Sequence, residues 1–211
     1  MMIMRLPGAA LLLLCASVHV GAHQVDEYLQ TARLSLAHGH LALELDLTPG
    51  VAVAPSILGS IDSNGDATIS PLEARAYAVS VLSDVAITLD GRTVAVALQS
   101  VAVPSSEELR NGTGTIHLRA AGQVDERTGP RQLRFRNDHR PDVSAYLANA
   151  LRSADRAVHV VNQTRDLRQR EIQIGYSVDS SRPIQLAWLL AALGGLAVLV
   201  AARTTPRPER G

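Results

Sequence analysis

Cysteine and lysine are almost missing from this sequence. Cys15 is the single cysteine among 211 residues, and lysine does not occur. Because Cys15 falls in a segment that we expect to be removed, the mature chain forms no disulfide and must be stabilised by core burial and by any ion it binds. All 20 basic side chains are arginines. With abundant alanine and valine, this usage indicates a bacterial genome rich in guanine and cytosine.

The sequence also lacks the short motifs of the common catalytic machineries. It contains no GxSxG elbow, HExxH helix, phosphate-binding P-loop or CxxC pair. These absences argue against the corresponding hydrolases, metalloproteases, nucleotide-binding proteins and thiol oxidoreductases. No other pattern favours catalysis, so we predict that the protein is not an enzyme.

Residues 1–22 have the pattern of a secretory signal peptide. Arg5 supplies the positive start, Leu11–Leu14 forms the apolar centre, and the small residues before His23 suit cleavage after Ala22. A lipoprotein signal is disfavoured, because Leu14 is too large for the position before Cys15. We therefore predict export, which in a bacterium means the periplasm, and we expect no nucleic-acid partner there.

Residues 184–202 form an uncharged apolar run of 19 residues. At ~1.5 Å per residue, a helix of this length spans about 28 Å, close to the hydrocarbon thickness of a bilayer. Trp188 lies near its start and three arginines follow its end, and a basic flank of this kind stays in the cytoplasm. A buried core helix is the alternative. We predict a transmembrane helix that anchors a single-pass protein in the cytoplasmic membrane, with residues 203–211 as a cytoplasmic tail.

The exported body, residues 23–182, has mostly a two-residue periodicity. Leucines at alternate positions of Leu41–Leu47 are typical of a half-buried strand. The dipeptide Asp90-Gly91 between two such runs predicts a hairpin. We predict a mainly β fold, an antiparallel β-sandwich, with strands at residues 28–36, 41–47, 85–89, 93–98, 113–120, 132–137, 144–151, 158–162 and 171–178.

Residues 62–73, Asp-Ser-Asn-Gly-Asp-Ala-Thr-Ile-Ser-Pro-Leu-Glu, are similar to the EF-hand calcium loop. That loop places oxygen ligands at positions 1, 3, 5, 7 and 9 and a bidentate Glu at 12, since calcium takes six to eight oxygens. Position 7 contributes its carbonyl, and position 9 acts directly or through water. The sequence therefore predicts a Ca²⁺ site formed by Asp62, Asn64, Asp66, Thr68, Ser70 and Glu73.

One loop position departs from the EF-hand pattern. Position 6 turns the chain with φ > 0 and is glycine in that family, whereas this sequence has Ala67. A Cβ in the left-handed region costs about 1–2 kcal/mol, so we expect a weakened site.

A polar turn before a capped helix explains part of the same segment without a metal. Ser70 would be the N-cap, Pro71 the first helical residue, and Glu73 the partner in a capping box. That interpretation leaves the alternating oxygens of residues 62–66 unexplained. The two interpretations are compatible, because the exit helix of an EF-hand begins inside its loop. We expect the EF-hand and its helix, at Pro71–Ser83 with apolar residues such as Leu72 and Val79 at helical spacing, to be an insertion at about residues 55–83.

The two parts of the body differ in charge. Residues 23–109 carry 11 acidic side chains and 3 arginines, whereas residues 110–182 carry 8 and 13. The arginines concentrate in Arg131–Arg140, where Arg134 and Arg136 share one face of a predicted strand. This pattern fits either an anionic partner or, as we favour, ion pairing with the acidic part of the same domain.

Histidines supply a different metal hypothesis. If cleavage follows Ala22, His23 becomes the amino terminus, and its amine and imidazole suit Cu(II). His38 and His40 flank a turn and are too few for a closed zinc site.

The calcium loop and four further segments resemble a group of bacterial exported proteins that carry an EF-hand and have no assigned activity. The segments are Val25–Gln30, Leu45–Gly50, Leu133–Asn137 and His139–Asp142. More distantly, the layout is similar to the exported β-domain of HupE/UreJ-type hydrogenase and urease accessory membrane proteins, some of which handle nickel. We expect a calcium-binding, membrane-anchored periplasmic module that contacts another envelope protein. The alternative is an accessory domain of a metal or solute transporter that binds nickel or copper through histidines.

Overall fold

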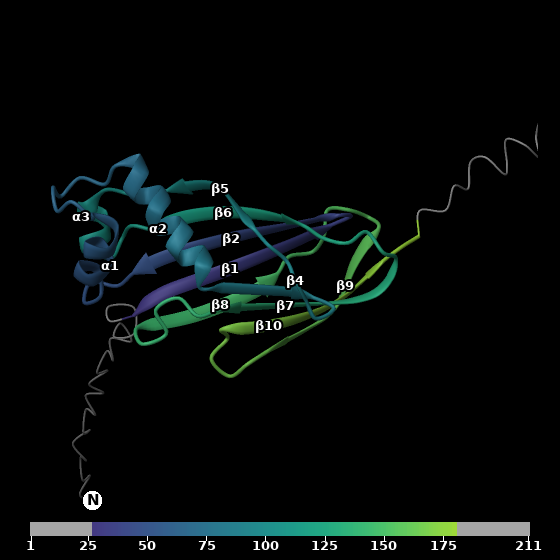
Figure 1. The fold of residues 1–211 in the computed structure, drawn as a ribbon. Coiled ribbons are helices and arrows are strands. Elements are labelled where there is room, and N and C mark those ends of the chain that lie inside the picture. The colour runs from purple at the N-terminus through teal and green to yellow at the C-terminus, as the bar shows by residue number, and fades with distance from the viewer. Residues whose placement is uncertain (1–26, 181–211) are drawn as a thin grey trace, which may run out of the picture.

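A computed structural model describes residues 27–180, and in this part the chain is mainly β (Figure 1). Two short helices lie between the second and third strands, as expected for the predicted insertion. The elements in order are β1 (Tyr28–Ala37), β2 (His40–Pro49), α1 (Ala54–Ile61), α2 (Pro71–Ser83), β3 (Val85–Leu89), β4 (Arg92–Thr93), β5 (Ala97–Ala102), α3 (Ser106–Arg110), β6 (Ile116–Gln123), β7 (Gly129–Asn137), β8 (Ser144–Ala150), β9 (Val158–Arg165) and β10 (Glu171–Val178).

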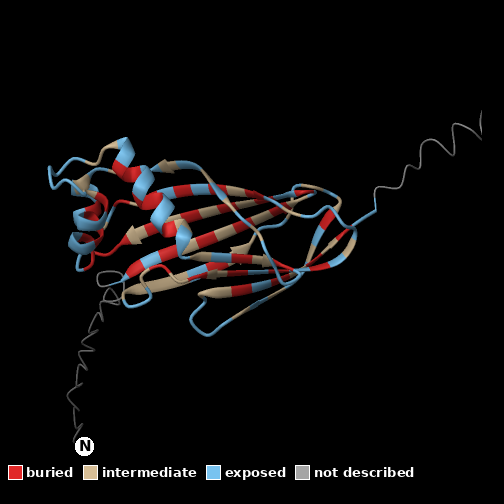
Figure 2. Ribbon diagram, viewed as in Figure 1, coloured by how far each residue is buried: buried red, intermediate tan, exposed pale blue. Residues whose placement is uncertain are grey.

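The strands form two five-stranded sheets that share one hydrophobic core. The first sheet has the order β5-β6-β2-β1-β8, and the second has the order β4-β3-β7-β10-β9. Alternate residues of β1, β2, β6, β7 and β10 are buried, which Figure 2 shows as repeated bands along the strands. The four leucines of Leu41–Leu47 are fully buried, as their alternation predicted, and pack with Leu133, Phe135 and Ile174 of the second sheet in the same cluster.

One strand pair corrects the antiparallel prediction. β1 pairs with β2 in antiparallel register through the predicted turn, but on its other side it pairs with β8 in parallel, with Tyr28 opposite Ser144. The other strand pairs in both sheets are antiparallel. The alternation of β1 specifies its buried face, but nothing in that pattern specifies the direction of its second neighbour.

The predicted strand 93–98 is also corrected. Asp90-Gly91 makes the predicted hairpin, but its second strand, β4, ends at Thr93, and the chain then crosses to the first sheet as β5. Gly122 of β6 allows this crossing, since a Cβ there would lie 2.5 Å from the carbonyl oxygen of Ala95. The short helix α3 was not predicted, although Ser105 and Glu108 form a capping box at its start.

The exit helix α2 begins and ends at the predicted residues, but it presents a different face to the core. Ala74, Tyr77, Ala78 and Val81 are buried, whereas Leu72 is 77% exposed. The helix packs against β5 of the first sheet and β3 of the second. It therefore covers one side of the shared core (Figure 1).

Several predicted features lie outside the described residues: the signal peptide 1–22, His23, the apolar run 184–202 and the tail 203–211. None of the helices between residues 27 and 180 is long and apolar enough to cross a membrane.

Candidate functional site

The predicted calcium loop connects two helices that are both held by the core. Ile61, the last residue of α1, is 1% exposed, and Ile69 within the loop packs against the core cluster. The loop residues between these two anchors are mostly exposed. A helix–loop–helix unit with fixed ends is therefore present where the sequence predicted one.

Asp62 organises the first half of the loop. Its Oδ1 accepts the backbone N–H groups of Gly65 at 2.8 Å and Asp66 at 3.2 Å, and its Oδ2 accepts the N–H of Ala67 at 2.8 Å. Three successive N–H groups thus point toward one carboxylate, and the backbone curls around the side chain at position 1 of the loop.

The next two predicted ligands continue this arrangement. Asn64 Oδ1 accepts the N–H of Asp66 at 3.0 Å, and Asp66 Oδ1 accepts the N–H of Thr68 at 2.8 Å. Asn64 Nδ2 donates to Asp66 Oδ2 at 2.9 Å. The alternating polar side chains are therefore on one side of the turn, each close to the next.

Ala67 adopts the backbone conformation that the EF-hand pattern requires at its position. Its φ is 66°, within the left-handed region that glycine usually occupies. The carbonyl of Ala67 accepts a hydrogen bond from Ser106 Oγ of α3 at 3.1 Å. The sequence-based expectation of φ > 0 at this residue is confirmed.

Glu73 forms the capping box at the start of α2. Its Oε2 accepts the N–H of Ser70 at 3.0 Å and the Ser70 hydroxyl at 2.7 Å, while its Oε1 accepts the N–H of Ser63 at 2.9 Å. The Ser70 hydrogen bonds lower the pKa of this carboxyl from 4.5 to about 2. Glu73 is 7% exposed, so the carboxylate is held, charged, between the two ends of the loop.

The residues fit a calcium site in type, order and backbone conformation, but their carboxylates do not converge. Glu73 faces backbone N–H groups rather than Asp62 and Asp66. Within residues 27–180, no three or more His, Cys, Asp or Glu side chains are grouped so that they could hold a metal. Calcium binding would therefore require Glu73 to exchange its capping contacts for the ion.

A polar cluster of three buried side chains and one exposed carboxylate lies directly beneath α2, and no local sequence signal marks it. We call Tyr28, Tyr77, Asp84 and His139 the His139 cluster. The hydroxyls of Tyr28 and Tyr77 are 2.7 Å apart, Tyr77 Oη is 3.2 Å from His139 Nε2, and His139 Nδ1 is 2.8 Å from Asp84 Oδ2. Both tyrosine rings also meet the imidazole edge-on.

The chemistry of the His139 cluster fixes the direction of its hydrogen bonds. Burial lowers the pKa of His139, so the imidazole is neutral, and the Asp84 carboxylate can only accept. His139 therefore donates from Nδ1 and accepts at Nε2 from Tyr77, which in turn accepts from Tyr28. Burial raises the pKa of Tyr77 to about 12, so this hydroxyl keeps its proton.

The backbone of His139 is held as tightly as its side chain. Its carbonyl accepts from Gln30 Nε2 at 2.8 Å and from the Tyr146 hydroxyl at 2.7 Å, and its N–H donates to Asn137 Oδ1 at 3.0 Å. Gln30, Asn137 and His139 come from β1, β7 and the segment that follows β7, and all three are buried. These parts of the chain therefore meet at one buried position.

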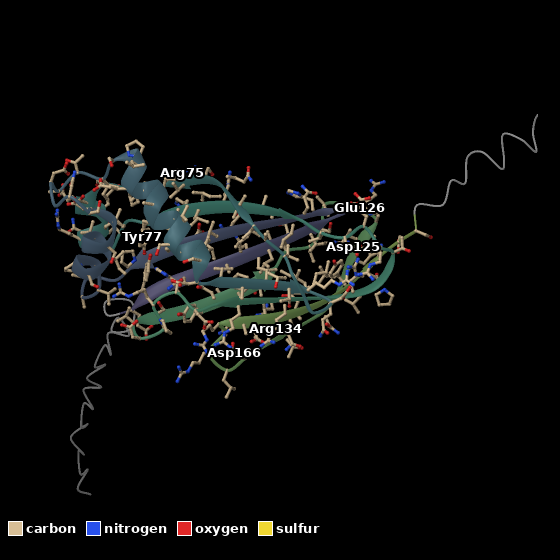
Figure 3. All side chains as sticks on the ribbon, viewed as in Figure 1. Arg75, Tyr77, Asp125, Glu126, Arg134 and Asp166 are labelled. Carbon is tan, nitrogen blue, oxygen red and sulfur yellow. The ribbon has the colours of Figure 1, made fainter. Side chains whose placement is uncertain are left out.

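A cleft of 490 Å³ connects the loop to the His139 cluster. Its lining includes Ser63 and Glu73 from the loop and Tyr77, His139 and Arg140 from the cluster and its neighbour. Figure 3 shows Tyr77 at the end of the molecule that carries the helices. The candidate calcium loop and the buried cluster are thus adjacent parts of one region.

The other described histidines are dispersed. His38 lies 3.8 Å from Glu126, which Figure 3 shows at the end opposite the helices. His117 pairs with Asp46 on the first sheet, and His159 pairs with Asp179. In the described part of the chain, histidines therefore do not assemble a nickel or copper site, and the proposed ligand His23 lies outside it.

Arginines of the basic segment form ion pairs within the domain. Arg134 Nη2 lies 2.6 Å from Glu171, on the exposed side of β7 (Figure 3), and Arg136 Nε lies 2.7 Å from Asp138. Arg131 Nε lies 2.7 Å from Asp90, which joins the basic part of the body to the acidic part. The favoured interpretation of the charge asymmetry is supported in part: Arg131 pairs with the acidic part, whereas Arg134 and Arg136 pair within the basic part.

Comparisons with protein families, with curated proteins and with solved structures found no match for this chain. A functional assignment must therefore be argued from the site itself.

Proposed function

We propose that this protein binds Ca²⁺ through the loop 62–73. The observation that carries the proposal is the conformation of Ala67, whose φ of 66° is unfavourable for a residue with a Cβ. A polar turn before a capped helix does not require a strained backbone at residue 67. An ion held inside the turn provides a reason for it, because the loop must curl to bring alternate oxygens to one centre.

The ligands would be the side chains of Asp62, Asn64 and Asp66, the carbonyl of Thr68, Ser70 directly or through water, and both oxygens of Glu73. Calcium would supply a cross-link between the end of α1 and the start of α2. The hydrogen bonds of Asp62 curl the first half of the loop around its carboxylate, and Glu73 is held ionised at the other end. The hydrogen bonds that lower the pKa of Glu73 keep it charged and available at any physiological pH.

We further propose that the two sheets form a β-sandwich with this EF-hand insertion, exported and anchored by residues 184–202, that presents the loop to another envelope protein. The described chain ends after β10, at the end of the molecule opposite α1 and α2 (Figure 1). Strands of ten residues are about 33 Å long. A C-terminal anchor would thus place the loop well away from the membrane. A periplasm-specific reporter should be active when fused after Val178 and inactive when fused after Gly211; the reverse pattern would contradict this orientation.

Calorimetric titration of the processed chain, which starts at His23 if cleavage follows Ala22, with Ca²⁺, Mg²⁺, Ni²⁺ and Cu²⁺ tests the calcium assignment. We expect one calcium site with a Kd on the order of 10⁻⁴–10⁻³ M, as in extracellular modules, and loss of binding in Glu73→Gln. Calcium binding that survives Glu73→Gln would contradict the ligand set. Nickel or copper binding that depends on His23, without calcium binding, would support the transporter-accessory alternative instead.

A further inference from the structure

The exit helix α2 is fixed to the β-domain at two places along its length. Tyr77, one turn after Glu73, bonds to Tyr28 of β1 and to His139. Asp84, the C-cap of α2, bonds to the other nitrogen of the same imidazole. A single histidine ring therefore joins the middle and the end of the helix.

The entry helix α1 is also held by the domain. The carbonyl of Gly50, directly after β2, accepts the N–H groups of Val53 at 3.1 Å and Ala54 at 2.9 Å. Ala54, Ile57 and Ile61 are each no more than 1% exposed. Moving α1 would thus detach Ile57 and Ile61 from the core cluster.

We propose that the His139 cluster clamps α2, so that calcium in the loop acts as a structural cross-link and does not open the helix pair. This inference rests on the proposed calcium site. Tyr77, His139 and Asp84 are positioning residues for Glu73: they hold the helix that carries it, without contacting the ion. The part of α2 beyond Tyr77 stays in place whether or not the loop is occupied.

The clamp has a consequence for affinity. A helix that is already ordered in the metal-free protein loses little entropy when Glu73 turns to the ion, so the clamp preorganises the site. Without the Tyr77 hydroxyl, the first turns of α2 must be ordered by binding itself. Since one hydrogen bond is worth about 0.5–1.5 kcal/mol, we expect calcium affinity to fall by about two- to tenfold in Tyr77→Phe.

Hydrogen exchange of the full-length chain, measured by mass spectrometry, tests the clamp without metal. In chelator, exchange across residues 71–83 should be about two- to tenfold faster in Tyr77→Phe than in the unmodified protein. The matched control is Tyr176→Phe, which removes a tyrosine hydroxyl from β10, outside the cluster. Asp84→Ala should reproduce the effect, and Asp84→Asn should not, because its amide oxygen still accepts from His139 Nδ1. Equal exchange in Tyr77→Phe and Tyr176→Phe would overturn the clamp.

The same hydrogen-exchange measurement with saturating calcium tests whether calcium acts as a structural cross-link without opening the helix pair. In the unmodified protein, calcium should slow exchange most in residues 62–73 and should not speed it in residues 78–83, with no increase in binding of the apolar dye ANS. In Tyr77→Phe, calcium should slow exchange along the whole helix by a larger factor. Faster exchange in residues 78–83 of the unmodified protein with calcium, or new dye binding, would overturn the inference. Absence of calcium binding would overturn the proposed function and this role of calcium, while the metal-free comparison would still decide on the clamp.

Discussion

The hydroxyl of Tyr77, on α2, accepts a hydrogen bond from the hydroxyl of Tyr28, on β1, across 2.7 Å. The first residue of the first described strand therefore meets the middle of the inserted helix. Both residues are at least 95% buried, and the Tyr77 hydroxyl donates its own hydrogen bond to His139 Nε2. The two hydroxyls and the imidazole form one chain, so their contributions to stability should not be independent.

A double-mutant cycle of Tyr28→Phe and Tyr77→Phe should show this dependence. Tyr77→Phe leaves the Nε2 acceptor of His139 buried without a donor, and it should lower the free energy of unfolding by about 1–3 kcal/mol. Tyr28→Phe removes only the terminal donor and should cost about 1 kcal/mol. The double variant should lose less than the sum, by at least about 0.5 kcal/mol. Additive losses in urea unfolding would mean that the two hydroxyls act separately.

Calcium should raise the melting temperature. An ion that binds only the folded chain stabilises it by RT ln(1 + [L]/Kd), which for a millimolar-range site and millimolar calcium is about 1 kcal/mol. We expect a rise of a few degrees in calorimetry of the full-length chain. Glu73→Gln should lower stability in chelator, because it weakens the capping box. It should also abolish the rise in melting temperature that calcium produces. A calcium-dependent rise that persists in this variant would exclude Glu73 as a ligand.

Single substitutions at positions 65 and 67 form a matched pair of tests, because both residues have a positive φ. Ala67→Gly removes a steric cost of about 1–2 kcal/mol and should raise calcium affinity by about five- to thirtyfold if the cost is borne mainly by the bound loop. Gly65→Ala has open space for its Cβ at a φ of 72°, so it adds only backbone strain and should weaken binding. Weaker binding in Ala67→Gly would mean that the bound loop does not turn at residue 67.

The capping box should make stability dependent on pH. The Ser70 hydrogen bonds hold the pKa of Glu73 at about 2, below its ordinary 4.5. A carboxyl group whose pKa is lowered by folding stabilises the folded state fully above its unfolded pKa, and this stabilisation is lost as the pH falls toward the folded pKa. In chelator, the stability difference between the unmodified protein and Glu73→Gln should therefore shrink between pH 4.5 and pH 2. A constant difference would show that the charge on Glu73 contributes nothing.

Local features of this fold could be predicted well because their signals are contained in short segments. The start of α2 follows from the capping box of Ser70 and Glu73 and from Pro71 in the first turn. β3 and β10 match the predicted bounds, since each is an apolar alternation with clear ends. The conformation of Ala67 follows from the spacing of oxygen-bearing residues around it.

Features that depend on distant partners could not be predicted. The face of α2 was misjudged because the helix lies close to the strands: small Ala74 and Ala78 permit that approach, and larger Leu72 turns outward. The break after Thr93 depends on Gly122, which is remote in sequence. The His139 cluster draws on three segments that are remote in sequence, namely β1, α2 with its C-cap, and the chain after β7, and none of them has an unusual local pattern.

Because β1 pairs in parallel with β8, the first sheet can be completed only late in synthesis. β1 is made first, yet its second neighbour, residues 144–150, appears only after more than half of the chain has been synthesised. Until then one edge of β1 has open backbone groups, and the side chain of Gln30 lacks its partners until Asn137 and His139 have been synthesised. Such long-range pairing slows folding, and open edges invite aggregation. Nascent chains that stop before residue 144 should consequently be the forms most dependent on chaperones and most readily degraded.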